Sequence, residues 1–251
     1  MVENVLIIEK GLWAPRNIII HKIAERSDIR LYPGDFEAIE ERWKEVLAKN
    51  KKAFIGPTVR FVGSHRIGED LIIEIIPSDY KEGCTLGWLG AAMVPITTDG
   101  YVGLQCHVDS ISATIGKGVR VPGCTIEDTE ETYHIIKEMK EEFNVEITTD
   151  DITIHGLIEV RPPVSLLNHA LIAKINLSLN YRELKKSWET ADDKTEGKLT
   201  FCKLDYSRKK ISFKEIGGKK MLNPQSLVIL EMISESEFGT KKGGEKIGRN
   251  L

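Results

Sequence analysis

The stretch VPGCTIEDTEETYHIIKEMKEEFNVEI, Val121 to Ile147, carries the clearest pattern in this chain of 251 residues. It opens with a Pro-Gly dipeptide, a turn signal, and continues as an acidic helix. Asp128 or Thr129 can cap the start of the helix, and Glu131 follows Asp128 at the spacing of a capping box. The sequence therefore predicts a turn, a loop and a helix in immediate succession.

The predicted helix separates into two sides at 100° per residue. The apolar side, which we expect to be buried, comprises Thr132, Ile135, Ile136, Met139 and Phe143. The acidic side, which we expect to face solvent or a ligand, comprises Glu131, His134, Glu138, Glu141 and Glu142.

Three carboxylates of the acidic side, Glu138, Glu141 and Glu142, fall within two turns. Like charges at this spacing repel one another. A hard cation such as Mg²⁺ relieves the repulsion, because it takes oxygen ligands and is usually shared with substrate phosphates. An acidic face is also the ordinary composition of a solvated helix. The helix alone leaves both interpretations open.

The spacing across this stretch resembles the signature of the Nudix hydrolases. That pattern reads Gly, five residues, Glu, seven residues, Arg-Glu, an apolar residue, any residue, Glu-Glu, any residue, Gly, an apolar residue. The positions that match without a gap are Gly123, Glu138, Met139, Glu141, Glu142 and Val145. The positions that depart are Thr129 for Glu, Lys137 for Arg and Asn144 for the late Gly, and Cys124 stands where a second Gly is frequent.

The departures concern the support of the loop and not the carboxylates. Asn144 replaces Gly at little cost, since Asn tolerates positive φ. Lys137 keeps the charge of Arg but lacks its fork of donors. Thr129 lacks the carboxylate that helps to fix the loop in the family, and Asp128 or Glu130 is positioned to compensate.

The resemblance implies Mg²⁺-dependent hydrolysis, with Mn²⁺ as an alternative ion, of a nucleoside diphosphate linked to another moiety. It implies that Glu138 and Glu142 are the principal metal ligands. Glu141 is implied as a further metal ligand or as the group that orients the attacking water, so that catalysis falls to Glu141 and Glu138. Glu196 stands where many members place another acidic residue, and a solvated loop charge is the equal alternative.

The loop before the signature supplies the expected phosphate contacts. Lys117 and Arg120 lie there, and Gly123 begins the signature itself. The segment IEERWKEVLAKNKKAFIGPTVRFVG, Ile39 to Gly63, looks like the leader of Nudix proteins that cleave UDP-sugars. A nucleotide sugar such as UDP-glucose is therefore the first expected substrate, and ADP-ribose is the second.

The resemblance implies a fold of the α/β (α+β) class, a mixed β-sheet sandwiched between helices with an N-terminal β/α extension. We expect the extension at residues 1–55, the Nudix domain at 56–238 and a disordered tail at 239–251. The dipeptide Asp99-Gly100, between two apolar runs, predicts a hairpin. Short β-rich segments in the extension, including residues 29–32, predict strands.

The composition indicates an ordinary globular chain, with 41% hydrophobic residues, 29% charged residues and a net charge of −3. No basic surplus indicates nucleic acid, and no apolar run reaches the roughly 20 residues of a membrane span. Its four cysteines are widely spaced, which disfavours a zinc site or a disulfide framework. We expect a cytoplasmic protein whose partner is a small nucleoside diphosphate derivative, and a homodimer is possible.

Three readings of the function follow. The first is a Nudix-type diphosphatase. The second is a Nudix-fold module that binds a nucleotide with little or no turnover, which the changes at Cys124, Thr129 and Lys137 favour. The third is an unrelated α/β domain with an acidic helix.

Overall fold

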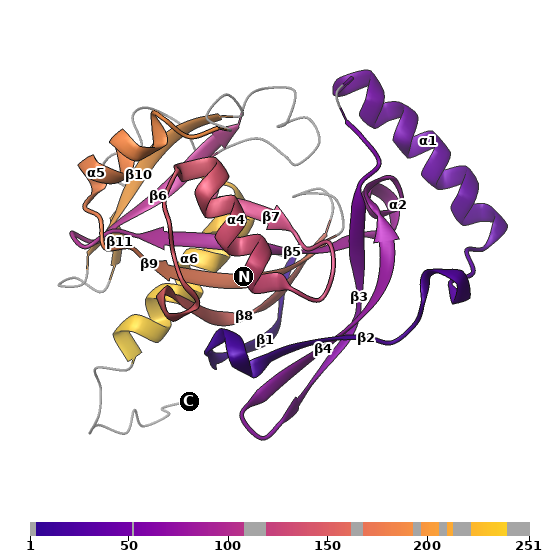
Figure 1. Cartoon of the computed structure of the whole chain (residues 1–251), viewed down its shortest axis with the longest axis horizontal. Helices are drawn as coiled ribbons and strands as arrows, with labels where there is room; N and C mark the ends of the chain where they lie inside the picture. The colour runs from indigo at the N-terminus through magenta and orange to yellow at the C-terminus, as the bar shows by residue number, and fades with distance from the viewer. Residues whose placement is uncertain are drawn as a thin grey trace, which may run out of the picture.

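The structure is a computed structural model that describes residues 4–51, 53–107, 119–161, 168–192, 197–205, 210–212 and 222–239. Its strands form two sheets (Figure 1). The large sheet has the order β1, β8, β9, β5, β6, β10, β11, with β7 paired to β5. Its strands are β1 (Val5–Trp13), β5 (Trp88–Ile96), β6 (Tyr101–His107), β7 (Gly123–Thr125), β8 (Ile152–Val160), β9 (Asn168–Asn176), β10 (Gly197–Asp205) and β11 (Lys210–Ser212).

The large sheet is mixed. Strands β5 and β9 run parallel, and the other described pairs of this sheet are antiparallel. The small sheet has the order β2, β4, β3, with β2 parallel and β3 antiparallel to β4. Its strands are β2 (Ile18–Lys22), β3 (Pro57–Ile67) and β4 (Asp70–Asp79).

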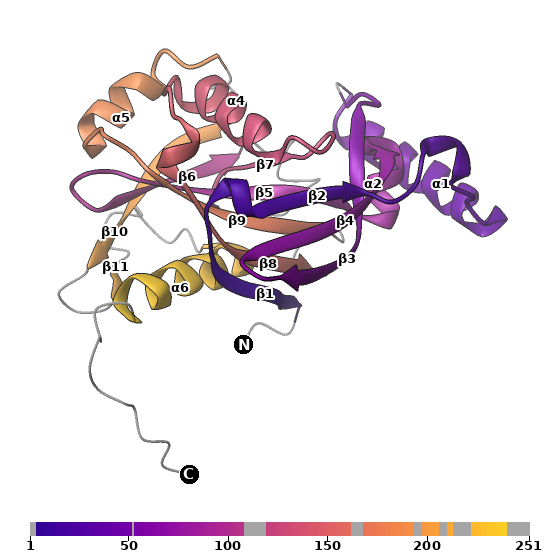
Figure 2. The ribbon, with the colours of Figure 1, turned by 60° about the horizontal axis from the view of Figure 1, so that its bottom comes forward.

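Helices cover both faces of the large sheet. Figure 2 shows α4 and α5 on one side and α6 on the other. The described α-helices are α1 (Pro33–Lys49), α2 (Tyr80–Leu86), α4 (Glu131–Phe143), α5 (Tyr181–Trp188) and α6 (Pro224–Gly239). Single-turn 3-10 helices occur at Pro15–Asn17, Arg26–Asp28 and Thr149–Asp151. The expected α/β class, with a mixed sheet between helices, is confirmed.

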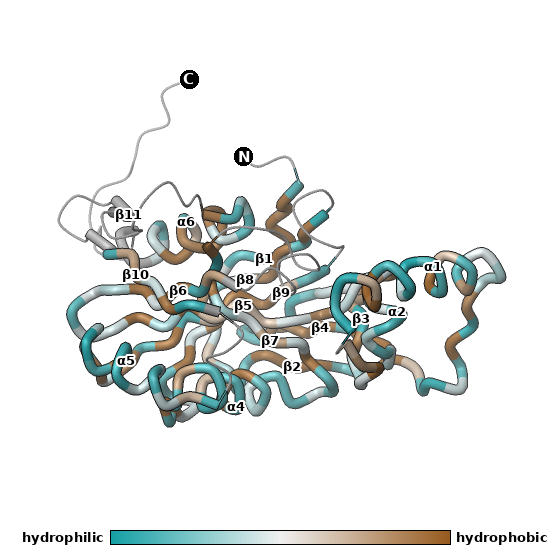
Figure 3. The backbone as a smooth tube through the Cα atoms, turned by 90° about the horizontal axis from the view of Figure 1, so that it is seen from above, coloured by the Kyte–Doolittle hydropathy of each residue, from teal (hydrophilic) through white to brown (hydrophobic). Residues whose placement is uncertain are grey.

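Strand β5 is buried along its whole length and separates two cores. Because side chains alternate along a strand, Leu89 and Met93 enter the core beneath α4, whereas Val94 enters the core beneath α6. Apolar residues on both faces are what a central strand covered on two sides requires. In Figure 3 the hydrophobic colour gathers along the middle strands of the large sheet.

The small sheet and α1 extend to one side of the large sheet (Figure 1). Helix α1 buries Trp43 and Val46, which pack in one cluster with Cys84 of α2 and Trp88 of β5. This cluster holds α2 against the start of β5. As a result α2, which follows the small sheet, lies beside the first residue of the central strand β5.

The structure confirms one of the local predictions and contradicts another. The hairpin is confirmed, with Gly100 at φ 80° and Thr97 Oγ1 2.7 Å from an oxygen of Asp99. The strand predicted at residues 29–32 is wrong, since this segment lies between a 3-10 helix and α1. The segment after β4 forms helix α2, which Asp79 caps by accepting the Glu82 N–H at 2.9 Å.

The predicted domain limits stay predictions. The segment before residue 55 contributes β1 to the large sheet and β2 to the small sheet. Except for Gly239, the tail lies outside the described residues. None of the helices in the described part of the chain combines the length and apolar character that crossing a bilayer requires.

Candidate functional site

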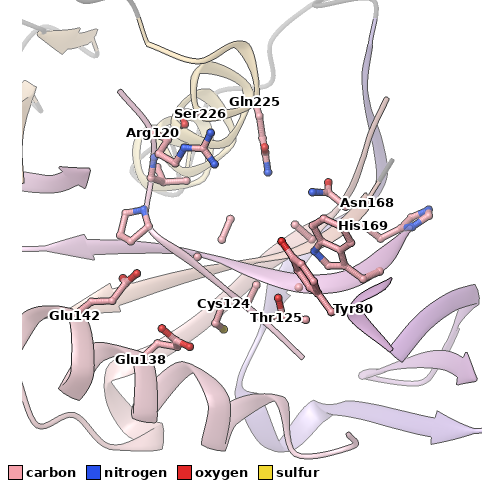
Figure 4. A pocket seen from close by; sticks show the side chains of 18 residues that line it. Tyr80, Arg120, Cys124, Thr125, Glu138, Glu142, Asn168, His169, Gln225 and Ser226 are labelled. Atoms are coloured by element: carbon pink, nitrogen blue, oxygen red, sulfur yellow. Dashed lines mark hydrogen bonds between the residues drawn. The ribbon is translucent and has the colours of Figure 1, made fainter. Parts of the chain in front are cut away.

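A pocket of about 290 Å³ opens beside the acidic side of α4 (Figure 4). Its wall is built by α4, β5 and β7, by the first residues of β9, α2 and α6, and by the segment before β7. Two of the three predicted glutamates, Glu138 and Glu142, line this pocket. The packing of these elements determines where the other side chains of the pocket lie.

Helix α4 is fixed by its apolar side. Ile135, Met139 and Phe143 are completely buried beneath it, as the helical pattern predicts. Anchoring that side orients the opposite one, so that Glu138 and Glu142, one turn apart, face the pocket (Figure 4). Glu142 is only 6% exposed, and a buried carboxylate is a costly group that indicates a specific role or partner.

Strand β7 brings the start of the signature against β5. Gly123 pairs with Ala92, and Cys124 pairs with Ala91. A Cβ atom on Gly123 would lie 2.7 Å from the carbonyl oxygen of Ala91. Glycine is required here by close backbone approach, and the predicted binding-loop position of Gly123 falls on the pocket wall.

Cys124 shares the pocket wall with the two glutamates. Burial raises the pKa of its thiol well above the ordinary value, and the negative charges of Glu138 and Glu142 raise it further. The group is therefore a neutral thiol at neutral pH. Its shifted pKa also reflects a concentration of negative charge at this end of the pocket.

Glu141 lies away from that concentration. It lines a separate depression with Tyr133 and Lys140, and its carboxylate is 3.9 Å from Lys137 Nζ. Within the described segments, no group of three His, Cys, Asp or Glu side chains is arranged to hold a metal ion. The structure thus brings Glu138 and Glu142 together but not Glu141, whose catalytic and metal-binding roles stay predictions.

Arg120 lies across the pocket from the glutamates (Figure 4). Its backbone forms a two-bond bridge with Gln105, with N···O distances of 2.8 and 2.9 Å. Burial lowers its pKa to about 10, so the guanidinium remains charged at neutral pH. The next residue, Val121, donates its N–H to Ser226 Oγ at 3.0 Å and so joins this segment to α6. The two other predicted groups, Lys117 and Glu196, lie outside the described residues.

Asp128 organises the loop that leads into α4. It accepts the Glu130 N–H at 2.7 Å and lies 3.0 Å from His134 Nε2. Burial disfavours its charged form, but the bonds from Glu130 and His134 outweigh that effect and lower its pKa. Thr129 is exposed and has no such part. Asp128 therefore supplies a loop-to-helix link, as expected for a compensating carboxylate.

His134 and Glu131 correct the predicted acidic face. Both lie on the side that we expected to face solvent or a ligand, and both are buried, at 5% and 6% exposure. His134 is covered by Asp128 and by the ring of Tyr133, 5.6 Å away between centroids. A helical wheel gives the direction in which a side chain points, but it does not show whether a neighbouring loop covers that side chain and buries it.

The end of the pocket away from the glutamates contains residues that sequence patterns do not single out. They are Tyr80, Asn168 and His169. Trp88 is 6% exposed and packs in the core, with part of it reaching the pocket. The parallel pairing of Trp88 with Asn168 places β9 beside β5 at this end, and no sequence spacing reveals it.

No family model matches the chain, and no curated protein matches it. Among solved structures it is similar to a bifunctional NMN adenylyltransferase/ADP-ribose pyrophosphatase from Francisella tularensis (TM-score 0.37, 14% identity), covering 80% of this chain and 47% of that one. It is also similar to a proposed oxidoreductase from Sinorhizobium meliloti (TM-score 0.31, 11% identity), covering 71% and 58%. The chain spans about half the length of these proteins.

Proposed function

We propose that this chain is a hydrolase that uses Mg²⁺ or Mn²⁺ to cleave a nucleoside diphosphate linked to another moiety. A nucleotide sugar such as UDP-glucose is the first candidate substrate, and ADP-ribose is the second. The observation that carries the proposal is the placement of Glu138 and Glu142, at signature positions, on one wall of a pocket that has Arg120 on another.

The donor set fits the ion. Mg²⁺ demands oxygen ligands, keeps several waters and is commonly held by one or two carboxylates together with substrate phosphates. Glu138 and Glu142 supply two carboxylates from one helical turn at the pocket wall, and Glu142 is only 6% exposed. A third protein ligand is not needed for a site that the substrate completes. When bound, the ion would neutralise phosphate charge and polarise phosphorus.

The chain's own residues account for binding and orientation. Arg120 presents a charged, planar set of donors that matches phosphate oxygens. Its backbone is fixed by the Gln105 bridge, and its side chain lines the pocket. The anchored α4 keeps the carboxylates opposite. A diphosphate between the two walls would meet positive charge on one side and metal ligands on the other.

A nucleotide-binding module without turnover is the second candidate. The observation that favours it is the placement of Glu141 outside the pocket, which leaves two of the three signature carboxylates at the site. If Glu141 must orient the attacking water, the observed arrangement binds substrate without activating water. The two candidates therefore differ in turnover and agree on ligand class.

Hydrolysis measured by chromatographic separation of nucleotide products decides between them. The panel is UDP-glucose, ADP-ribose, diadenosine polyphosphates and NADH, each with Mg²⁺ or Mn²⁺ and with chelator. We expect metal-dependent cleavage of at least one, and a loss on the order of 100-fold in Glu142→Gln. Glu146→Gln, the same change at an exposed position after α4, is the matched control.

Two results would contradict the proposal. Wild-type activity in a folded Glu142→Gln variant would exclude the metal assignment. Nucleotide-dependent thermal stabilisation with no cleavage of any panel member would replace the hydrolase with the binding module.

A further inference from the structure

The pocket has two chemically different ends (Figure 4). One end carries Glu138, Glu142 and Arg120. The other, which we call the aromatic end, is defined by Tyr80, Asn168 and His169. The proposed function uses the charged end for a diphosphate and leaves the aromatic end without a role.

Tyr80 is held firmly at the aromatic end. Its ring lies 5.6 Å from that of Trp88 at an interplanar angle of 32°, and 6.3 Å from that of Trp43 in an edge contact. The Tyr80 N–H also donates to Gly56 O at 2.9 Å. A ring braced by two tryptophans and a backbone bond loses little freedom when a ligand packs on it. Tyr80 is thus a preformed aromatic surface.

Asn168 brings a hydrogen-bonding amide to the same end. Its Oδ1 atom is buried, and within the described residues it has no hydrogen-bond partner. A buried polar atom left in that state costs free energy, and such atoms call for an explanation in ligand or water. The residue is the first of β9, fixed by its pairing with Trp88. Asn168 thus brings to the pocket wall an amide whose oxygen lacks a partner within the described residues.

His169 closes this end without adding charge. Its ring lies 4.4 Å from that of Phe61, and its Nε2 atom lies 3.6 Å from Glu159 Oε2. Burial lowers its pKa, although Glu159 acts in the opposite direction. The imidazole is consequently neutral at neutral pH. Planar, uncharged groups and one amide thus face a ligand here, in contrast to the ionic groups at the other end.

We propose that the aromatic end binds the nucleobase of the ligand, with Tyr80 packing on the ring and the Asn168 amide reading the base edge. A side-chain amide presents a donor and an acceptor side by side, which matches adjacent acceptor and donor groups on a nucleobase. Aromatic side chains contribute a stacking surface that every base can use. The inference rests on the proposed function only in that the diphosphate occupies the charged end.

Isothermal titration of the full chain with inorganic pyrophosphate, UDP, ADP and glucose 1-phosphate, in the presence of Mg²⁺, tests this assignment. The wild type should bind UDP or ADP at least about tenfold more tightly than pyrophosphate, since stacking adds to the phosphate contacts. Asn168→Ala and Tyr80→Leu should each remove most of that difference and leave pyrophosphate affinity unchanged. Tyr80→Phe, which keeps the ring, should retain it.

Equal binding of pyrophosphate and both nucleotides by the wild type would overturn the assignment. So would an equal loss of pyrophosphate and nucleotide binding in Asn168→Ala with an unchanged melting temperature. A loss confined to glucose 1-phosphate would place a sugar at this end instead. Base-dependent binding without any cleavage would retain the inference and reject the hydrolase, so the two failures are distinguishable.

Discussion

Gly123 and Ala91 approach so closely that a Cβ atom on Gly123 would lie 2.7 Å from the Ala91 carbonyl oxygen. The contact belongs to the pairing of β7 with β5, which fixes the start of the signature stretch to the centre of the large sheet. Both residues also line the pocket. The close pairing of β7 with β5 therefore also places this part of the pocket wall beside Glu138 and Glu142.

Gly123→Ala should therefore disturb both stability and the site. The added methyl group meets backbone, which cannot rotate away, and overpacking of this kind costs about 1–3 kcal/mol. Denaturant unfolding gives the loss of unfolding free energy. Gly34→Ala in α1, where the new Cβ meets no atom within 4 Å, is the control and should be neutral or slightly stabilising. Equal stability of both variants would show that β7 moves freely away from β5.

Asn144 ends α4 in the left-handed conformation, at φ 51° and ψ 42°. Asn144→Ala should cost about 1–2 kcal/mol, because alanine is disfavoured there and the 2.8 Å bond from Asn144 Nδ2 to Thr190 Oγ1 is lost. Asn144→Gly loses the same side-chain bond without the steric cost, so it should be less destabilising. Thermal unfolding of the two variants measures the difference. Equal losses in the two variants would mean that the Thr190 bond, and not the backbone conformation of Asn144, determines the stability of this end of α4.

The sequence predicts those features of α4 that depend on the helix alone. Its buried stripe at Ile135, Met139 and Phe143 follows from the period of 3.6 residues. Its end at Asn144 follows from the residue type that tolerates positive φ. Each of these depends on neighbours within one or two turns, and such local effects are what a pattern in the chain encodes.

The aromatic end of the pocket depends instead on contacts between distant segments. Asn168 reaches the pocket through parallel pairing with Trp88, 80 positions earlier in the chain. Tyr80 reaches it because Asp79 caps a short helix where the segment's Gly and Cys residues favour a loop. Tertiary packing overrides weak local preference in both cases. Function-bearing residues of this kind become visible only when the strand order is known.

Glu131 should make the stability of the protein depend on pH. Burial raises its pKa from 4.5 to about 7, so the folded state holds the proton more tightly than the unfolded state does. The free energy of unfolding is therefore higher below pH 4.5 and falls as pH rises toward 7. Glu131→Gln should remove this dependence and stabilise the protein by on the order of 3 kcal/mol at pH 8.

Urea unfolding at pH 4.5 and pH 8 measures this effect. The Glu131→Gln variant should match the wild type at the lower pH and exceed it at the higher. Glu130→Gln, at the exposed neighbouring position, is the control and should change little at either pH. A variant with no gain at pH 8 would show that Glu131 is hydrated or paired when ionised.

Glu141 and Glu142 are adjacent in sequence but lie on different sides of α4, because successive residues are separated by 100° on a helix. Glu142 is buried at the pocket, whereas Glu141 lies beside Lys137 at another depression. On this geometry, Glu141→Gln should lose far less activity than Glu142→Gln. It should also leave Mg²⁺ affinity within about threefold of the wild type, because the substitution breaks only the partly exposed ion pair between Glu141 and Lys137, and such pairs contribute little energy. Steady-state kinetics and Mg²⁺ titration, with Glu146→Gln as the control, measure both quantities. Equal losses in the two variants would mean that α4 turns or shifts when ligand binds and brings Glu141 to the reacting phosphate, which is the role that the signature implies.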